Sequence, residues 1–183
     1  MTNLQLVFPE IFLSLSIMFL LILGVFKKNS SKIIQNLSLA VLLITAVITF
    51  NETIGIKEVK LFNNSIIIDY LSSLMKIVTL LATFLVLIIS SNYLRTFKIF
   101  KIEYPILILS SVLGMMIMIN SNDLIVFYMG LELQSLALYV LATFNRDQIK
   151  SSEAGLKYFV LSALSSGLLL YGCSLIYLSL IHI

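Results

Sequence analysis

Long apolar stretches alternate with short polar ones along the whole chain. Six of the apolar stretches are close to the roughly 20 residues that a helix needs to cross a bilayer. They are continuous runs rather than alternating apolar and polar positions, so the pattern predicts helices and not the strands of a barrel. We therefore expect an all-α membrane protein with a single transmembrane domain over 1–183. The predicted spans lie at roughly 9–26, 33–51, 70–92, 104–120, 123–144 and 154–180.

Basic residues gather in every second connection between the predicted spans. The connections after the first, third and fifth spans hold Lys27, Lys28, Lys32, Arg95, Lys98, Lys101, Arg146 and Lys150. The other connections hold Lys57 and Lys60. Because lysine and arginine are enriched on the cytoplasmic side of membrane proteins, both termini are predicted to face the periplasm or the intermembrane space.

Composition supports the membrane prediction and excludes several kinds of chemistry. The chain is 60% hydrophobic and 11% charged, with a mean hydropathy of +1.07, which is too apolar for a soluble domain. The net charge of +3 comes from scattered basic residues, so no nucleic-acid binding is expected. With one cysteine, Cys173, and one histidine, His182, we expect no metal site. No phosphate loop, dinucleotide motif or nucleophile triad is present, so no catalytic residue or redox cofactor is predicted in this chain.

Glu132 lies near the middle of the predicted fifth span. A carboxylate at that depth costs several kcal/mol unless it is paired, solvated or protonated, and such residues are usually functional. Tyr128, Ser135 and Tyr139 share its helix face, because the spacings of four, three and four residues follow the helical repeat. We predict a proton-carrying glutamate on a polar path. A buried structural ion pair, or a protonated glutamate bonded to a hydroxyl, is the alternative.

Lys157 is the second candidate for proton transfer. It lies near the start of the predicted sixth span, where it could relay protons or provide the charge partner of Glu132. The alternative is a lysine whose ammonium reaches the interface. Glu153 precedes it by one helical turn and could pair with it.

We expect mainly structural roles for the remaining polar residues of the spans. We expect Lys76 to reach the interface or to form a local ion pair, with Asp69 as the suggested partner, and a part in transport is the alternative. Asp123 begins the fifth span, where a carboxylate caps a helix N-terminus. Small residues such as Gly155 and Gly167 in the sixth span predict close helix packing.

Two motifs resemble a known family. Gly130-Leu-Glu-Leu-Gln-Ser-Leu136 in the fifth span and Glu153-Ala-Gly-Leu-Lys-Tyr158 in the sixth are similar to NADH dehydrogenase (ubiquinone) subunit 2, an antiporter-like membrane subunit of respiratory complex I. A weaker likeness runs from Pro9 to Tyr177. The resemblance implies proton translocation driven by quinone reduction elsewhere in the complex. It also implies that Glu132 and Lys157 are the matching intramembrane glutamate and lysine.

The resemblance further implies an enzyme complex in which this chain performs no redox chemistry. NADH, FMN, iron–sulfur clusters and ubiquinone are expected in other parts of the complex, and lipid and other membrane-arm subunits are the expected contacts of this chain. Family members usually have about fourteen spans in two inverted repeats, whereas six are predicted here, half of an antiporter-like bundle.

Two explanations for the six spans stay open. A separate chain could supply the C-terminal helices of a split subunit, or a reduced subunit could keep a structural role. We favour the split, because a structural remnant would not need a buried acid such as Glu132. Other hypotheses are a homo-oligomeric secondary transporter and a structural or assembly protein without transport. The residue usage, typical of an AT-rich coding sequence, and the lack of a targeting segment predict the mitochondrial inner membrane, with a bacterial plasma membrane as the alternative.

Overall fold

The six predicted spans are all helices in the computed structural model, which describes residues 6–26, 31–53, 58–97, 99 and 101–181. Each helix is long and apolar enough to cross a membrane. The prediction of a multi-pass helical membrane protein is therefore confirmed. The helices are α2 (Phe8–Phe26), α3 (Ser31–Thr53), α4 (Tyr70–Thr96), α5 (Glu103–Asn120), α6 (Leu124–Ala142) and α7 (Ile149–Ile181).

The largest difference in helix boundaries is at the start of α7. The helix begins at Ile149, whereas the apolar pattern places the span from 154 onward. Hydropathy marks where a helix enters lipid, but backbone hydrogen bonds can continue the helix into water. Here the amide of Ser152 donates to the carbonyl of Gln148 at 3.2 Å, so the first polar turn of α7 forms before the apolar part of the helix.

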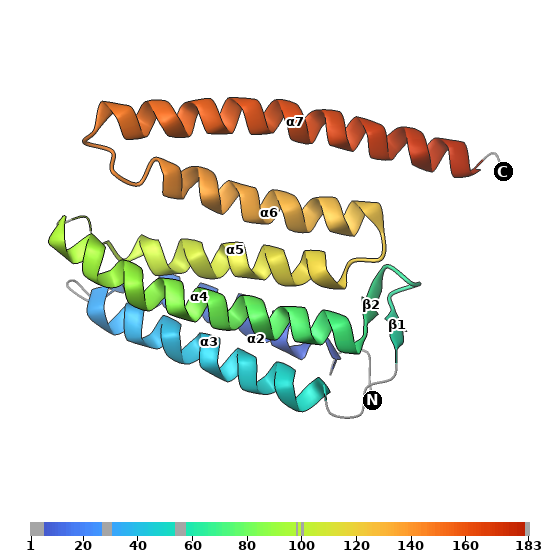
Figure 1. The fold of residues 1–183 in the computed structure, drawn as a ribbon, viewed down its shortest axis with the longest axis horizontal. Helices are drawn as coiled ribbons and strands as arrows, with labels where there is room; N and C mark the ends of the chain where they lie inside the picture. The colour runs from blue at the N-terminus through green and yellow to red at the C-terminus, as the bar shows by residue number, and fades with distance from the viewer. Residues whose placement is uncertain (1–5, 27–30, 54–57, 98, 100, 182–183) are drawn as a thin grey trace.

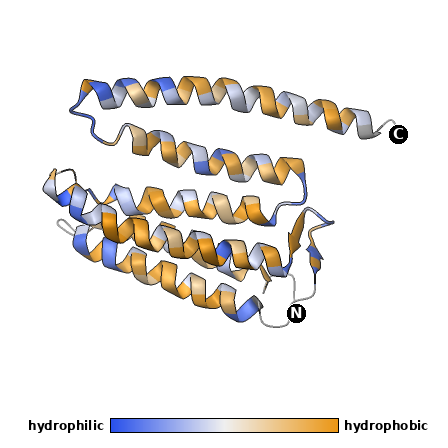
Figure 2. Cartoon of the chain, viewed as in Figure 1, coloured by the Kyte–Doolittle hydropathy of each residue, from blue (hydrophilic) through white to orange (hydrophobic). Residues whose placement is uncertain are grey.

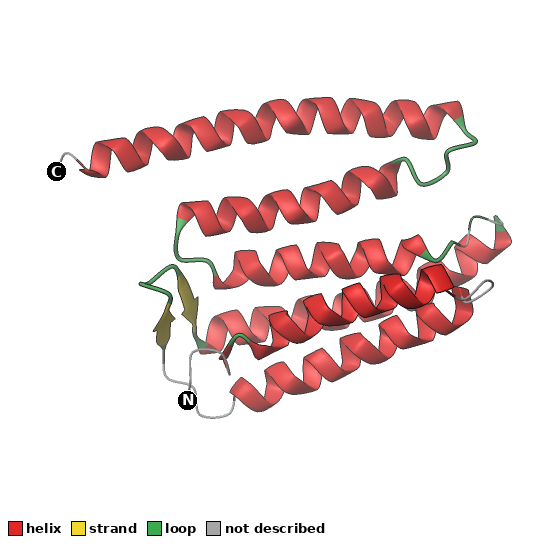
Figure 3. Cartoon of the chain, turned by 180° about the vertical axis from the view of Figure 1, so that it is seen from behind, coloured by secondary structure: helices red, strands yellow, loops and turns green. Residues whose placement is uncertain are grey.

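Helices α2 to α5 form a packed group, and α6 and α7 extend from it as a row (Figures 1 and 3). The buried core comes from the first four helices, with α6 packed against α5 and α7 packed against α6. No residue in the most apolar window of α7 is buried within the described part of the chain. The outer face of α7 therefore meets lipid or further protein.

A short β-hairpin lies in the connection between α3 and α4, which the sequence predicted as a loop. Strands β1 (Val59–Leu61) and β2 (Ile66–Ile68) pair antiparallel. The turn between them includes Asn63 and Asn64 at positive φ, a conformation that asparagine tolerates better than most residues. Asn122, in the connection between α5 and α6, donates its side-chain amide to the carbonyl of Asn64 at 2.7 Å. The fold is thus helical, as predicted, with one small hairpin in the connection that the sequence predicted as a loop.

The start of α2 and the end of α7 lie at the same end of the molecule as the hairpin, which we call the hairpin end (Figure 1). Lys32, Lys101, Arg146 and Lys150 lie at the opposite end, where Figure 2 shows hydrophilic residues near the connections. Which end faces the cytoplasm stays a prediction. Lys27, Lys28, Lys57, Lys98 and His182 lie outside the described residues.

Two glycines allow α5 and α6 to approach closely. A Cβ atom added at Gly114 would lie 2.7 Å from the carbonyl oxygen of Gly130 and 2.7 Å from the amide nitrogen of Gln134. A Cβ atom added at Gly130 would in turn lie 2.9 Å from the carbonyl oxygen of Gly114. The contact is backbone against backbone, as at other close helix crossings in membranes. Gly130 precedes Glu132 by two residues, so Glu132 lies close to this crossing along α6.

We expect Gly114→Ala to destabilise the protein by about 1–3 kcal/mol, because an added methyl group must push two backbones apart. Gly167→Ala is the matched control, since nothing lies within 4 Å of a Cβ atom added there. Alanine is the better helix former by about 1 kcal/mol, so the control should be neutral or stabilising. Thermal denaturation of the two solubilised variants measures the difference. Equal stability of both variants would contradict the close crossing.

Among the three glycines of α7, one packs closely against a neighbouring residue and two do not. A Cβ atom at Gly155 would lie 1.8 Å from the Cγ2 atom of Thr143, whereas added Cβ atoms at Gly167 and Gly172 meet no described atom within 4 Å. The predicted close packing is therefore confirmed near the turn between α6 and α7, and Gly167 and Gly172 face away from the described helices.

Candidate functional site

Glu132 lies on α6, near the middle of the span, as predicted. Its Oε2 atom is shielded from solvent and accepts no hydrogen bond from any residue that the structure describes. The hydroxyl of Ser135 donates to the backbone carbonyl of Glu132 at 3.0 Å, and so does not satisfy the carboxylate. An unsatisfied buried carboxylate oxygen is costly in free energy. A bound proton, a water molecule or a hydrogen-bond donor from additional helices would satisfy this atom.

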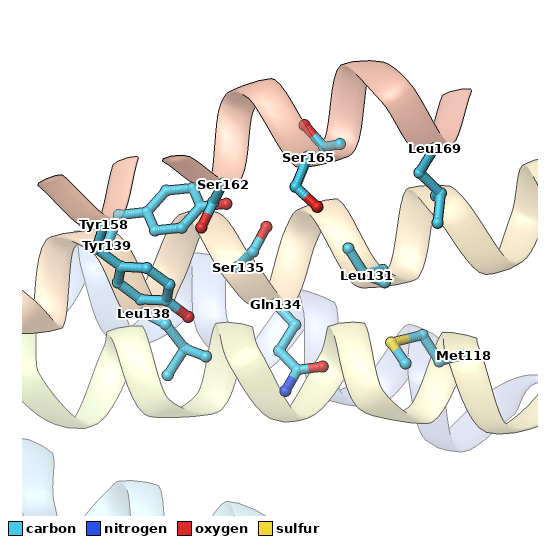
Figure 4. A pocket seen from close by; sticks show the side chains of 11 residues that line it. Met118, Leu131, Gln134, Ser135, Leu138, Tyr139, Tyr158, Ser162, Ser165 and Leu169 are labelled. Carbon is cyan, nitrogen blue, oxygen red and sulfur yellow. The ribbon is translucent and has the colours of Figure 1, made fainter. Parts of the chain in front are cut away.

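A pocket with several polar side chains in a mostly apolar lining lies next to this part of α6, between α6 and α7 (Figure 4). Ser135 and Tyr139 from the predicted polar path line it, and its volume is about 320 Å³. That volume holds several water molecules, since each occupies about 30 Å³ of liquid. Among the described residues, Glu132 and Tyr128 do not line this pocket. Helical spacing still places Glu132 on the same side of α6 as Tyr139. The other lining residues are Met118, Leu131, Gln134, Leu138, Tyr158, Ser162, Ser165, Ser166 and Leu169.

Aromatic side chains hold α6 against α7 at one end of this pocket. The ring of Tyr139 is buried and meets the rings of Tyr158 and Phe159 edge to face, with centroids 4.9 and 5.6 Å apart. Edge-to-face pairs at these distances stabilise a contact beyond the area they bury. Tyr139 therefore fixes the distance between the two helices that enclose the pocket.

Lys157 lies on α7 and pairs with Glu153, one helical turn earlier. The Nζ atom is 2.5 Å from Oε1 of Glu153, and both side chains are more than half exposed in the described chain. The structure thus brings Lys157 to Glu153, and among the described ion pairs none joins Lys157 to Glu132. This ion pair with Glu153 agrees with the structural alternative given for Lys157 in the sequence analysis. Its part in proton transfer stays a prediction.

Lys76 shows the clearest difference from the sequence prediction. Its side chain is 2% exposed, and its Nζ atom lies 2.5 Å from Oε1 of Glu10 on α2. The suggested partner, Asp69, instead caps α4 by accepting a hydrogen bond from the amide of Ser72 at 2.7 Å. The predicted reach to the interface and the suggested partner Asp69 are therefore wrong, whereas an ion pair does form, with Glu10. The pairing joins residues 66 positions apart (76 − 10), which no local pattern can reveal.

Sequence analysis did not select Glu10 as a functional residue. It lies in the first turn of α2 and is buried, and the side-chain amide of Asn120 donates to its Oε1 atom at 2.9 Å. A signal was present, because Glu10 and Lys76 carry opposite charges near the hairpin ends of two apolar spans. Two such charges stabilise each other when their helices pack side by side. Which helices pack side by side is decided by the tertiary structure, so the sequence alone does not reveal the pair.

Asp123 caps α6, as predicted. Its Oδ1 atom accepts a hydrogen bond from the amide of Ile125 at 2.8 Å, and the hydroxyl of Tyr177 on α7 also donates to it. The hydrogen bond from Tyr177, followed by that from Ile125, holds the pKa of Asp123 below its usual value near 3.8. The charged form of Asp123 thus ties the start of α6 to the last turns of α7.

This contact predicts a pH effect at Asp123, the residue just before α6. Because the folded pKa of Asp123 is lowered, its stabilisation is fully present above pH 3.8 and is lost as the pH falls through the folded pKa. Asp123→Asn keeps a capping side chain but does not titrate, so the wild-type protein should lose more stability than the variant over this acidic range. Denaturation midpoints of both proteins across the range measure the effect, and parallel curves would contradict it.

The fold and these residues define a class: helical membrane proteins that carry ionisable side chains inside their spans. Comparison with known proteins makes this more specific. Residues 121–180 match the family model described as NADH:quinone oxidoreductase/Mrp antiporter, TM. Over 97% of its length the chain is 68% identical to NADH-quinone oxidoreductase subunit N of Pelagibacter ubique (strain HTCC1062), and over 96% it is 49% identical to the same subunit of Maricaulis maris (strain MCS10). The resemblance predicted from the two motifs is therefore confirmed: the chain is similar to NADH-quinone oxidoreductase subunit N over nearly all of its own length.

The chain spans about a third of the length of these relatives, 37% and 36% respectively. Two solved structures share its fold. Respiratory complex I from Thermus thermophilus with bound aureothin matches with a TM-score of 0.76 and 24% identity, over 92% of this chain and 36% of the other. The archaeal membrane-bound sulfane sulfur reductase matches with a TM-score of 0.77 and 21% identity, over 96% and 37%. At these identities the likeness shows the fold alone.

The comparisons also bear on location. The subunit N relatives come from bacteria, so they do not support the predicted mitochondrial inner membrane and favour the bacterial alternative. The residue usage that suggested a mitochondrion reflects the base composition of a coding sequence, which is independent of compartment.

Proposed function

We propose that this chain contributes to proton translocation as part of a membrane-arm subunit of NADH:quinone oxidoreductase in a bacterial plasma membrane. The observation that carries the proposal is the buried, unpartnered Oε2 atom of Glu132 within an apolar span. The 68% identity to subunit N of Pelagibacter ubique supports the family to which this glutamate would belong. Because the chain covers about a third of that relative, the activity belongs to the larger assembly.

In this proposal Glu132 gains and loses a proton inside the membrane. The neutral form suits the apolar surroundings, whereas the charged form needs water or a cation close by. Water in the pocket between α6 and α7 would deliver the proton past Ser135 and Tyr139. Lys157 would tune Glu132 electrostatically or pass the proton onward once further helices cover the exposed face of α7. Other subunits would hold NADH, FMN, the iron–sulfur clusters and ubiquinone and would carry out the redox chemistry.

Further helices are expected against α7, because none of the residues in its apolar window is buried by the described chain. In the family these are the later spans of subunit N, present either in the same polypeptide or in a second one. The other candidate functions, a homo-oligomeric transporter and a structural subunit, would cover α7 with a second copy of this chain or with unrelated membrane subunits.

Mass spectrometry of the proteins that co-purify with this chain from gently solubilised membranes tests the proposal. We expect the subunits of NADH:quinone oxidoreductase, with this chain at one copy for each complex. Intramembrane lysines beyond residue 183, in the same polypeptide or in a partner, should be recovered with it. Recovery of copies of this chain alone would contradict the proposal and favour the homo-oligomeric transporter.

A further inference from the structure

A pocket lies between α2, α5 and α6, at the end of the helices opposite the hairpin end. Its volume is about 210 Å³. The side chains of Leu21 on α2 and Val140 on α6 are 42% and 43% exposed, so the pocket opens on the outer surface of the described helices. We call it the basic-end pocket. Its lining consists of five apolar and three charged residues, Leu21, Ile106, Leu107, Val140 and Phe144 with Lys101, Glu103 and Arg146.

Two packing contacts hold the walls of the basic-end pocket in place. The rings of Tyr104, in the first turn of α5, and Phe144, just after α6, lie edge to face with their centroids 5.6 Å apart. A Cβ atom added at Gly24 on α2 would lie 2.8 Å from the Cγ2 atom of Ile102, the residue before α5. The first contact joins α5 to the turn after α6, and the second joins α2 to the start of α5. The pocket is thus formed by the packing of three helices, as ligand sites usually are.

Charged and apolar residues of the basic-end pocket lie at different depths along the helices. Lys101 and Arg146 lie in the connections outside α5 and α6. Glu103 is the first residue of α5, whereas Leu107 lies one turn further in, about 6 Å deeper at 1.5 Å for each residue. The pocket therefore runs from a charged entrance at the membrane surface to an apolar interior within the span.

The charged entrance favours an anion. Lys101 and Arg146 provide two positive charges and Glu103 one negative charge, which leaves one positive charge in excess. Among the ion pairs between described residues, none includes any of these three side chains. The ammonium and guanidinium groups are thus not neutralised by a described carboxylate. Both are groups that bind phosphate in proteins.

A phospholipid with a negatively charged head group combines the two properties that the basic-end pocket requires. Its phosphate lies at the membrane surface, level with the cations, and its acyl chains lie in the hydrocarbon, level with the apolar lining. Basic pockets between membrane helices are known to bind such head groups. A free phosphate ion would leave the apolar part of the pocket unused, and a neutral lipid would leave the excess positive charge unbalanced.

We propose that the basic-end pocket binds one anionic phospholipid, with its phosphate group between Lys101 and Arg146 and one acyl chain along Leu21, Leu107 and Val140. Such a lipid would fill the space between α2, α5 and α6 at this end of the span. The proposal goes beyond proton translocation, and its test uses no pumping measurement, so it stands or fails separately from the proposed function.

Photolabelling in membranes that hold the whole assembly tests the proposal. The probe is phosphatidylglycerol with a photoreactive diazirine in one acyl chain, and mass spectrometry of peptides locates its adducts after illumination. We expect adducts on the segments that contain Leu21, Leu107 and Val140. Excess unlabelled phosphatidylglycerol should suppress them, whereas the same excess of phosphatidylcholine, which has similar chains and a zwitterionic head group, should not.

The double variant Lys101→Gln with Arg146→Gln tests the part of the head group. A basic residue beside an anionic lipid surface raises the attraction about fivefold, so the double variant should lower these adducts by roughly 25-fold. Lys32→Gln with Lys150→Gln is the matched control, because it removes two exposed cations at the same end that do not line the pocket. Its adducts should equal those of the wild type. Equal labelling of the two double variants would overturn the proposal.

Leu21→Trp tests the part of the acyl chain, because the larger side chain fills the apolar interior while both cations stay. Leu15→Trp is the matched control, since Leu15 is 64% exposed on the same helix and does not line the pocket. We expect Leu21→Trp, and not Leu15→Trp, to lose the adducts on α5. If phosphatidylcholine competes as well as phosphatidylglycerol, the pocket holds any lipid chain and the proposed head-group site is wrong. Absence of adducts from the wild-type pocket would also overturn the proposal and indicate that protein covers it.

Discussion

Replacing Glu132 by glutamine should abolish proton transfer through this part of the membrane while the complex still assembles. Glutamine has nearly the same shape as glutamate but cannot take up a proton. Losing a positioned acid–base group typically slows proton transfer by 10²-fold or more. The expected measurement is a loss of NADH-driven acidification in reconstituted vesicles, compared at equal amounts of assembled complex.

Glu103→Gln provides the control for this experiment. Glu103 is an exposed carboxylate in the first turn of α5, so the same chemical change there removes a solvated charge. Its pumping should equal that of the wild-type complex. Full pumping by Glu132→Gln would refute the role of Glu132 as a proton carrier. Loss of assembly in that variant would instead support the structural alternative, in which Glu132 is needed for packing.

Replacing Lys76 by methionine should destabilise the protein by about 3–5 kcal/mol, because it leaves the buried carboxylate of Glu10 without its cation. Lys76 is 2% exposed and lies 2.5 Å from Glu10, so water cannot replace the lost charge. Lys60→Met is the control. Lys60 pairs with Glu58 at 3.8 Å with both side chains more than half exposed, and such surface pairs contribute at most about 1 kcal/mol. Thermal denaturation of the two solubilised variants measures the difference.

The double variant Glu10→Gln with Lys76→Met distinguishes the effect of the ion pair on stability from the effect of side-chain packing. Neutral replacement of a buried ion pair is often close to neutral in stability, so the double variant should regain most of what Lys76→Met loses. A double variant as unstable as Lys76→Met would show that the lysine stem matters through packing rather than through charge. A fully stable Lys76→Met would contradict the burial of the ion pair itself.

The span predictions agree closely with the structure because each depends on a short stretch of chain. Transfer of apolar side chains into lipid is a local property, and backbone bonding inside a helix is local as well. The cap at Asp123 and the pairing of Lys157 with Glu153 are local for the same reason. The hairpin at 59–68 escaped prediction, because its strands are three residues each and their pairing is visible only once the chain turns at Asn63 and Asn64.

The sequence by itself determined the six long apolar helices that the described residues form and showed that Glu132 is an acid within one of them, and its motifs were sufficient for the resemblance to subunit N. Only the tertiary structure decided which helices are neighbours, and therefore that Lys76 meets Glu10 and not Asp69. The physical reason is that hydropathy acts on each span separately, whereas the choice of neighbours depends on many weak packing contacts summed over whole helices, such as the crossing at Gly114 and Gly130. A buried charge is stabilised only by the partner that this packing brings to it.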